Sequence, residues 1–178
     1  MKCLFFDTET TALFSNSLLE IGQQPRIIEF YGMIMDDTQL VHQTLGFRCN
    51  PGISLEKKVT EITGIKDEDL ANEPPFGMFR QTVSRLLMEA DAIVAHNLSY
   101  DMAVLSAEYK RFDADNPPFP WERICTVEAT EYIKGYRLNL TGLHQYLFGE
   151  AFTSAHSAEA DVKAMARCFW ELKARELI

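Results

Sequence analysis

Four acidic residues lie where the neighbouring sequence predicts buried structure. Asp7 and Glu9 follow the apolar run of residues 2–6, and a spacing of two puts both side chains on one face of an extended strand. Asp101 and Asp161 each fall in the first turn of a predicted helix, at the head of an apolar stripe. Taken singly, each could be a solvated strand end or an acid favoured by the helix dipole. Together they predict an acidic cluster.

An acidic cluster inside a fold needs positive charge, because like charges on one face repel and an unpaired buried ion costs several kcal/mol. Divalent cations remove that conflict, and ligands that are all oxygens select Mg²⁺ or Mn²⁺ over zinc. Such clusters commonly hold two ions about 3.5–4 Å apart, which stabilise the attacking and leaving oxygens of phosphoryl transfer. The four acids therefore predict a site for two Mg²⁺ or Mn²⁺ ions.

A histidine stands close to one of these acids in the sequence. His156 lies five residues before Asp161, in a segment of small residues at 151–157. A histidine in a loop is usually a surface residue, but this one is tethered beside the predicted metal site. Because the pKa of imidazole is near neutrality, we expect His156 to act as a general base that deprotonates the attacking water.

The predicted elements alternate in an order that can bring these residues together. Three early strands at residues 2–6, 26–35 and 43–48 have short connections, which predicts an antiparallel meander. Short buried strands follow at 92–95 and 124–126. Helical patterns cover residues 55–62, 76–88, 98–112, 127–133, 141–147 (with Thr141 as its N-cap) and 158–175. This order predicts an α/β protein whose mixed sheet is flanked by helices.

Composition limits the classes of protein that the sequence can encode. A length of 178 residues, 47% hydrophobic and 24% charged, is typical of one globular domain, and no apolar run approaches the roughly 18 residues of a membrane span. Four scattered cysteines predict reduced thiols in a cytoplasmic protein. The net charge of −9 argues against a strong electrostatic grip on long nucleic acid. Since four of the acids are predicted metal ligands, binding of a nucleic-acid end at a metal centre stays compatible with that charge.

Three segments in this order resemble the motifs of the DEDDh 3′→5′ exonucleases, the group that includes the proofreading subunit of bacterial DNA polymerase III. They are residues 6–11 (FDTETT), 95–101 (AHNLSYD) and 156–161 (HSAEAD), the last matching the pattern H-x-A-x-x-D. Residues 62–65 (ITGI) with Asp69 and Leu70 are similar to the family's segment between the first two motifs. The resemblance spans nearly the whole chain, and a histidine in the third motif is typical of the histidine branch.

The resemblance implies a ribonuclease H-like fold, with the first three strands antiparallel and the later ones parallel, and a single exonuclease domain over residues 1–178. It implies a phosphodiester hydrolase that uses two metal ions to release nucleoside monophosphates from a 3′ end. By motif position, Asp7, Glu9 and Asp161 would hold one ion, Asp7 would bridge to the second, and Asp101 would support that one. The general base would be His156. By the same comparison, the substrate-binding residues would be Thr8, Thr10 and Asn97.

Several departures and alternatives accompany this interpretation. Ala12 stands where the family often has glycine, and the insertion at residues 13–25 could shape substrate access or be a plain surface loop. The chain stops at Ile178, which leaves no tail for a polymerase partner, so that partnership is unproven. We expect DNA, single-stranded, rather than RNA as the substrate, with an exoribonuclease or oligoribonuclease as the alternative. The competing classes are a catalytically silent module that binds nucleic-acid ends and a cation-binding protein without nucleic acid.

Overall fold

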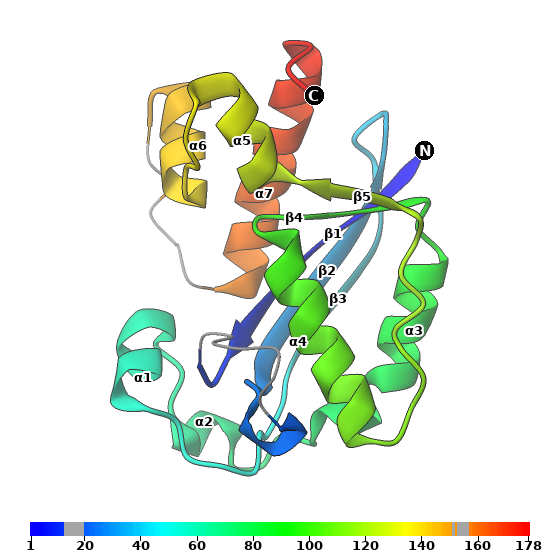
Figure 1. Cartoon of the computed structure of the whole chain (residues 1–178), viewed down its shortest axis with the longest axis vertical. Coiled ribbons are helices and arrows are strands. Elements are labelled where there is room, and N and C mark those ends of the chain that lie inside the picture. The colour runs from blue at the N-terminus through cyan, green and yellow to red at the C-terminus, as the bar shows by residue number, and fades with distance from the viewer. Residues whose placement is uncertain (13–19, 151, 153–156) are drawn as a thin grey trace.

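A five-stranded mixed sheet forms the centre of the protein. The computed structural model describes residues 1–12, 20–150, 152 and 157–178. The strands lie in the order β3-β2-β1-β4-β5 (Figure 1). Their bounds are Lys2–Thr10 (β1), Ile27–Asp36 (β2), Val41–Arg48 (β3), Ala92–Ala95 (β4) and Glu122–Cys125 (β5). The first three strands pair antiparallel and the last two join in parallel, so the predicted fold class is confirmed.

The first strand is longer than its apolar run predicts. β1 continues to Thr10, because β2 pairs with it along its whole length, with a register irregularity between Glu9 and Thr10. The alternative that the strand ends before Asp7 is therefore wrong. On its other side, β1 pairs with β4 only from Cys3 to Phe5. In the described residues, the end of β1 thus has no strand on that side.

Helices cover both faces of the sheet. Helix α7 (Ala158–Ala174) packs on β1 and β2, where the ring of Phe169 makes an edge contact with Phe5 at 5.2 Å between centroids. Helix α6 (Leu140–Phe148) packs on α7, and α5 (Thr126–Lys134) lies beside it (Figure 1). Side chains alternate along a strand, so residues next to Phe5 point to the opposite face.

The opposite face is covered by α3 (Arg80–Met88) and α4 (Leu98–Arg111) (Figure 1). A stack of three rings runs from the sheet toward α3, with Phe30 on Phe47 and Phe47 on Phe79. Helix α4 begins directly after β4, which places its first turn beside the part of β1 that β4 leaves uncovered. This placement determines where the acid of α4 lies.

Some predicted boundaries need correction. The helix expected at 76–88 is divided into a 3₁₀ turn, η2 (Phe76–Met78), and α3. The Phe112 ring lies against Gly77 of that turn, where an added Cβ would be 2.6 Å from it. The N-cap of α6 is Asn139 rather than Thr141, since the Asn139 side chain accepts the Gly142 amide at 2.8 Å. The remaining short elements are α1 (Lys57–Thr63), α2 (Asp67–Leu70) and η1 (Ile21–Gln23), of which η1 lies in the predicted loop.

Two further expectations concern cysteines and membranes. The four cysteines are free thiols, and only Cys125 is not fully buried. Within the described ranges, no helix combines the length and apolar character that crossing a membrane requires. The predicted insertion at 13–25 is described only for residues 20–25, and residues 13–19 lie outside the described part.

Candidate active site

Three of the predicted acids lie together where β1 meets the start of α7. Carboxylate oxygens of Asp7, Glu9 and Asp161 all lie within 4.8 Å of one another, and each side chain is partly buried. Asp7 and Glu9 share one face of β1, as their spacing requires, and that face is covered by α7. Asp161 lies in the first turn of α7. A set of three oxygen donors this close can hold a divalent cation.

The fourth acid approaches from the other side of the sheet. Asp101 lies in the first turn of α4, is 2% exposed, and accepts a hydrogen bond of 2.8 Å from the hydroxyl of Thr8. It is not one of the three carboxylates within mutual 4.8 Å. Its charge nevertheless acts on them, because burial and then the Asp101 carboxylate raise the pKa of Asp7 well above its ordinary value.

The same electrostatic conflict affects the other carboxylates. Burial, followed by the charges of Asp161, Glu29 and Asp101, raises the pKa of Glu9 to about 7. Burial raises the pKa of Asp101 to about 7, although the hydrogen bond from Thr8 opposes the change. A cation between the carboxylates would reverse this repulsion. The residues therefore fit a divalent ion both by donor chemistry and by charge.

The predicted substrate contacts occupy different environments. Thr8 is buried and directed at Asp101. The hydroxyls of Thr10 and Tyr100 lie within hydrogen-bond distance of each other, and each lies 2.8 Å from the Ala12 carbonyl oxygen, which can accept from either. These contacts connect α4 to the end of β1 and the residues that follow it. Asn97 is exposed, with a φ of 78°, at the start of α4. The predicted general base, His156, lies outside the described residues.

One further acid of the site is not predicted from the sequence. Glu29 of β2 pairs in register with Glu9, and its carboxylate accepts hydrogen bonds from Arg48 Nε at 2.9 Å and from the Ala158 amide at 3.0 Å. Its charge contributes to the raised pKa values of Asp7 and Glu9. The available signal was an acid inside an apolar strand, which can be recognised as part of this site only once the β1–β2 register is known.

A cavity of about 410 Å³ opens beside the cluster. Glu9, Thr10 and Ala12 form its inner wall, and α1 with the residue before it forms the outer wall. The outer wall consists of Glu56, Lys58, Val59, Ile62 and Thr63. The cavity thus places apolar side chains next to carboxylates, an arrangement that suits a ligand with an apolar face and a charged group. Of these outer residues, only Ile62 and Thr63 belong to the segment that resembles the family between its first two motifs.

Comparison with known proteins defines the class. The sequence model of the RNase T family, described as Exonuclease, matches residues 4–169. The chain therefore belongs to the exonuclease family. The PolC-type DNA polymerase III of Streptococcus pneumoniae is 29% identical over 170 residues, covering 91% of this chain and 10% of that protein. The chain thus spans about a tenth of the length of the curated relatives it matches.

Solved structures show the same fold. Escherichia coli Exonuclease I in complex with a dT13 oligonucleotide has a TM-score of 0.78 at 20% identity, covering 98% of this chain and 41% of that one. The nuclease domain of 3′hExo, a DEDDh family member bound to rAMP, has a TM-score of 0.80 at 18% identity, covering 98% and 92%. The family match confirms the predicted resemblance to the exonucleases, and these structures show the fold that the resemblance implies.

Proposed function

We propose that this exonuclease domain, taken as residues 1–178, removes nucleoside monophosphates from the 3′ end of single-stranded DNA with the help of two divalent cations, Mg²⁺ or Mn²⁺. The observation that carries the proposal is the meeting of Asp7, Glu9 and Asp161 within 4.8 Å, with Asp101 raising the pKa of Asp7 from the other side. An exonuclease-family fold with an acidic cluster that needs a cation supports phosphodiester hydrolysis.

The family motifs assign the following roles to these residues. Asp7, Glu9 and Asp161 would hold one ion, and Asp7 with Asp101 would hold the second. When bound, divalent ions would polarise the scissile phosphate and stabilise the charge on the leaving oxygen. His156 would accept the proton of the attacking water. With the ions bound, the electrostatic effect of the site on a phosphate would change from repulsion to attraction.

The cavity beside Glu9 would receive the terminal nucleoside. Val59 and Ile62 offer apolar surface to a base, and Thr10 on the opposite wall lies next to the carboxylates. Because the wall has one polar side and one apolar side, a nucleotide can place its base against α1 and its phosphate toward β1. Binding of one terminal nucleotide, rather than a long duplex, agrees with the net charge of −9. Thr8 holds Asp101 in place, and Asn97 lies exposed at the start of α4 to contact the strand.

RNA is the second candidate substrate. The curated relatives are DNA polymerases, and Exonuclease I was solved with dT13, which favours DNA. The solved 3′hExo domain carries rAMP, which favours RNA. Discrimination requires a contact to the 2′-hydroxyl, so the two polymers must be compared directly.

The deciding experiment uses 5′-labelled single-stranded DNA and RNA of equal sequence with Mg²⁺ or Mn²⁺. We expect laddering from the 3′ end of DNA that disappears with EDTA and in Asp7→Ala. A faster ladder on RNA would reverse the substrate assignment, and an unchanged ladder in Asp7→Ala would refute the metal site. If neither polymer is cut, the silent end-binding module is favoured instead. Separately, His156→Ala should lose most activity near neutral pH and still bind Mn²⁺, whereas full activity would remove it as the base.

A further inference from the structure

A row of charged side chains crosses three strands next to the candidate site. Glu9 of β1 pairs in register with Glu29 of β2, and Glu29 pairs in register with Arg48 of β3. Paired residues of neighbouring strands point to the same face of a sheet, here the face that α7 covers. Two carboxylates side by side repel, and the guanidinium of Arg48, 2.9 Å from Glu29, compensates the outer one.

Glu29 also holds the first residue of α7. The amide of Ala158 donates to Glu29 Oε2 at 3.0 Å, while Ser157, the N-cap residue, makes no side-chain cap. The first amides of a helix have no partner within the helix, so a carboxylate supplied by a strand can accept a hydrogen bond from one of them. Its negative charge also interacts favourably with the positive end of the helix dipole. The Glu29 side chain is only 15% exposed, which limits competition from water.

The consequence concerns Asp161, which lies on the same first turn. The Asp161 amide donates to the Ser157 carbonyl oxygen at 2.9 Å. The helical turn that carries the Asp161 carboxylate therefore begins at Ser157, the neighbour of Ala158. Glu29 therefore connects the first turn of α7 to β2, and through the sheet to Asp7 and Glu9. A shift at Ala158 would move Asp161 relative to the two acids of β1.

We propose that Glu29, oriented by Arg48, is a positioning residue that fixes the start of α7 and thereby sets the position of Asp161 against Asp7 and Glu9. This inference rests on the proposed function only for its catalytic readout. The cation-binding geometry that it predicts can be measured without any substrate.

The test separates the charge of Glu29 from its hydrogen bond. Glu29→Gln removes the charge but keeps an oxygen that can accept the Ala158 amide, whereas Glu29→Ala removes both. Mn²⁺ affinity, measured by calorimetry without substrate, should fall about tenfold or more in Glu29→Ala and clearly less in Glu29→Gln, because residues that orient metal ligands typically contribute about 10–100-fold. Arg48→Met should weaken Mn²⁺ binding in the same direction. In turnover, kcat should fall with KM nearly unchanged.

The matched control is Glu159→Ala, which removes another glutamate of the first turn of α7. Its carboxylate is exposed and pairs with Lys163 of the same helix. Equal Mn²⁺ affinity in Glu29→Ala and Glu159→Ala, both folded by circular dichroism, would overturn the proposal. Equal losses in Glu29→Ala and Glu29→Gln would also overturn it, since charge alone would then explain the effect. If Glu29→Ala does not fold, the comparison of Arg48→Met with Glu159→Ala decides. An inactive wild type would refute the proposed function but leave the Mn²⁺ comparison valid.

Discussion

The hydroxyl of Thr8 donates a hydrogen bond of 2.8 Å to Oδ1 of Asp101, joining two buried residues that are 93 positions apart in the chain. The bond links β1 to the first turn of α4 and restrains the Asp101 carboxylate, whose charge helps to raise the pKa of Asp7. A buried acceptor that loses its donor costs about 1–3 kcal/mol. We therefore expect Thr8 to orient Asp101, a role that is compatible with the substrate contact that the family resemblance implies.

The first prediction replaces that donor. Thr8→Val keeps the size of the side chain but cannot donate, so we expect kcat to fall about tenfold or more, with a smaller change in KM. Steady-state cleavage of a labelled oligonucleotide measures both constants. Thr8→Ser keeps the hydroxyl and should retain most of the activity. If Thr8→Val is as active as Thr8→Ser, the hydrogen bond does not orient Asp101.

The second prediction concerns pH and the cation together. Without metal, the pKa values of Glu9 and Asp101 are about 7 in the folded protein, above the ordinary values of 4.5 and 3.8. Between the ordinary and the raised values, the folded state binds more protons than the unfolded state, so the free energy of unfolding must decrease as pH rises. Thermal unfolding in EDTA should therefore show a falling midpoint from about pH 5 to about pH 8.

Saturating Mg²⁺ should remove that fall, because bound cations favour the ionised carboxylates in the folded state. A pKa change of one corresponds to about 1.4 kcal/mol, so the loss in EDTA should exceed about 1 kcal/mol. A midpoint that is equally flat with EDTA and with Mg²⁺ would contradict the raised pKa values.

The third prediction separates function from stability. Asp161→Asn removes one charge from a set of mutually repelling carboxylates while keeping nearly the same shape. In EDTA near neutral pH we expect this variant to unfold at a higher temperature than the wild type, and we expect its nuclease activity to be lost. Differential scanning calorimetry and the cleavage assay test the two halves. Loss of stability in the variant would show that Asp161 is held by favourable contacts rather than strained by repulsion.

Local periodicity predicts much of this fold and of the spacing of the acids. Alternation along a strand is a property of the extended backbone, so it places Asp7 and Glu9 on one face before any partner strand is known. Helical period likewise puts Asp161 above the buried side chains of Met165 and Cys168. The meander follows from the short connections, the later parallel strands are implied by the family resemblance, and the strand pairing confirms both. The catalytic roles of these residues stay predictions.

Features that depend on register or on distant partners escape local patterns. Glu29 belongs to the site only because β2 pairs with β1 in a register that sets it opposite Glu9. Asn139 and Thr141 are both acceptable cap residues by type, and the choice depends on where the first helical turn begins. The Asn139 side chain accepts the Gly142 amide, which makes Asn139 the cap. Residues of α1 line the cavity because α1 lies beside the end of β1, a placement that depends on tertiary structure.

The fourth prediction concerns that wall. Ile62 is 45% exposed and lines the cavity proposed for the terminal base. Ile62→Ala should raise KM about threefold to tenfold with little change in kcat. The reason is that burial of the removed carbon atoms contributes about 1 kcal/mol equally to binding of the substrate and of the transition state. Ile53→Ala, with a similarly exposed isoleucine outside the cavity, is the matched control. Parallel effects of the two variants would place the base elsewhere.

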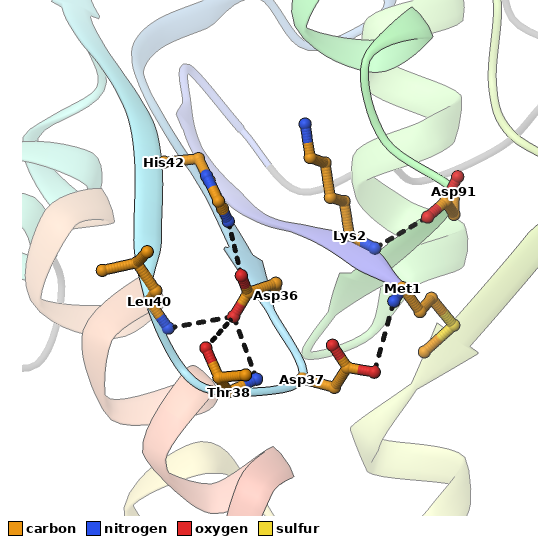
Figure 2. Close-up of polar contacts among 8 residues, drawn as sticks. All are labelled: Met1, Lys2, Asp36, Asp37, Thr38, Leu40, His42 and Asp91. Carbon is orange, nitrogen blue, oxygen red and sulfur yellow. Dashed lines mark hydrogen bonds and ion pairs between the residues drawn. The ribbon is translucent and has the colours of Figure 1, made fainter.

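The turn between β2 and β3 is held by the hydrogen bonds of one carboxylate. Figure 2 shows Asp36, whose Oδ1 accepts from the backbone amides of Thr38 and Leu40, at 2.9 and 3.2 Å, and from the Thr38 hydroxyl at 2.6 Å. Its Oδ2 lies 2.6 Å from His42 Nε2. These hydrogen bonds, with that of Thr38 the strongest influence, hold the pKa of Asp36 well below its ordinary value. The neighbouring Asp37 carboxylate instead lies 3.3 Å from the amino group of Met1.

The fifth prediction follows from the opposite sign of this shift. A carboxyl whose pKa is lowered in the folded state stabilises the fold above its ordinary pKa, and that contribution is lost as pH falls below about 4 toward the folded value. Asp36→Asn should therefore lower the unfolding midpoint at neutral pH and flatten its decrease in acid, while Asp37→Asn should change little, since exposed ion pairs contribute weakly. Thermal unfolding from neutral pH into acid, with Mg²⁺ present throughout to suppress the opposite trend of the site carboxylates, compares the variants. An acid decrease as steep in Asp36→Asn as in the wild type would assign the acid sensitivity to other carboxylates.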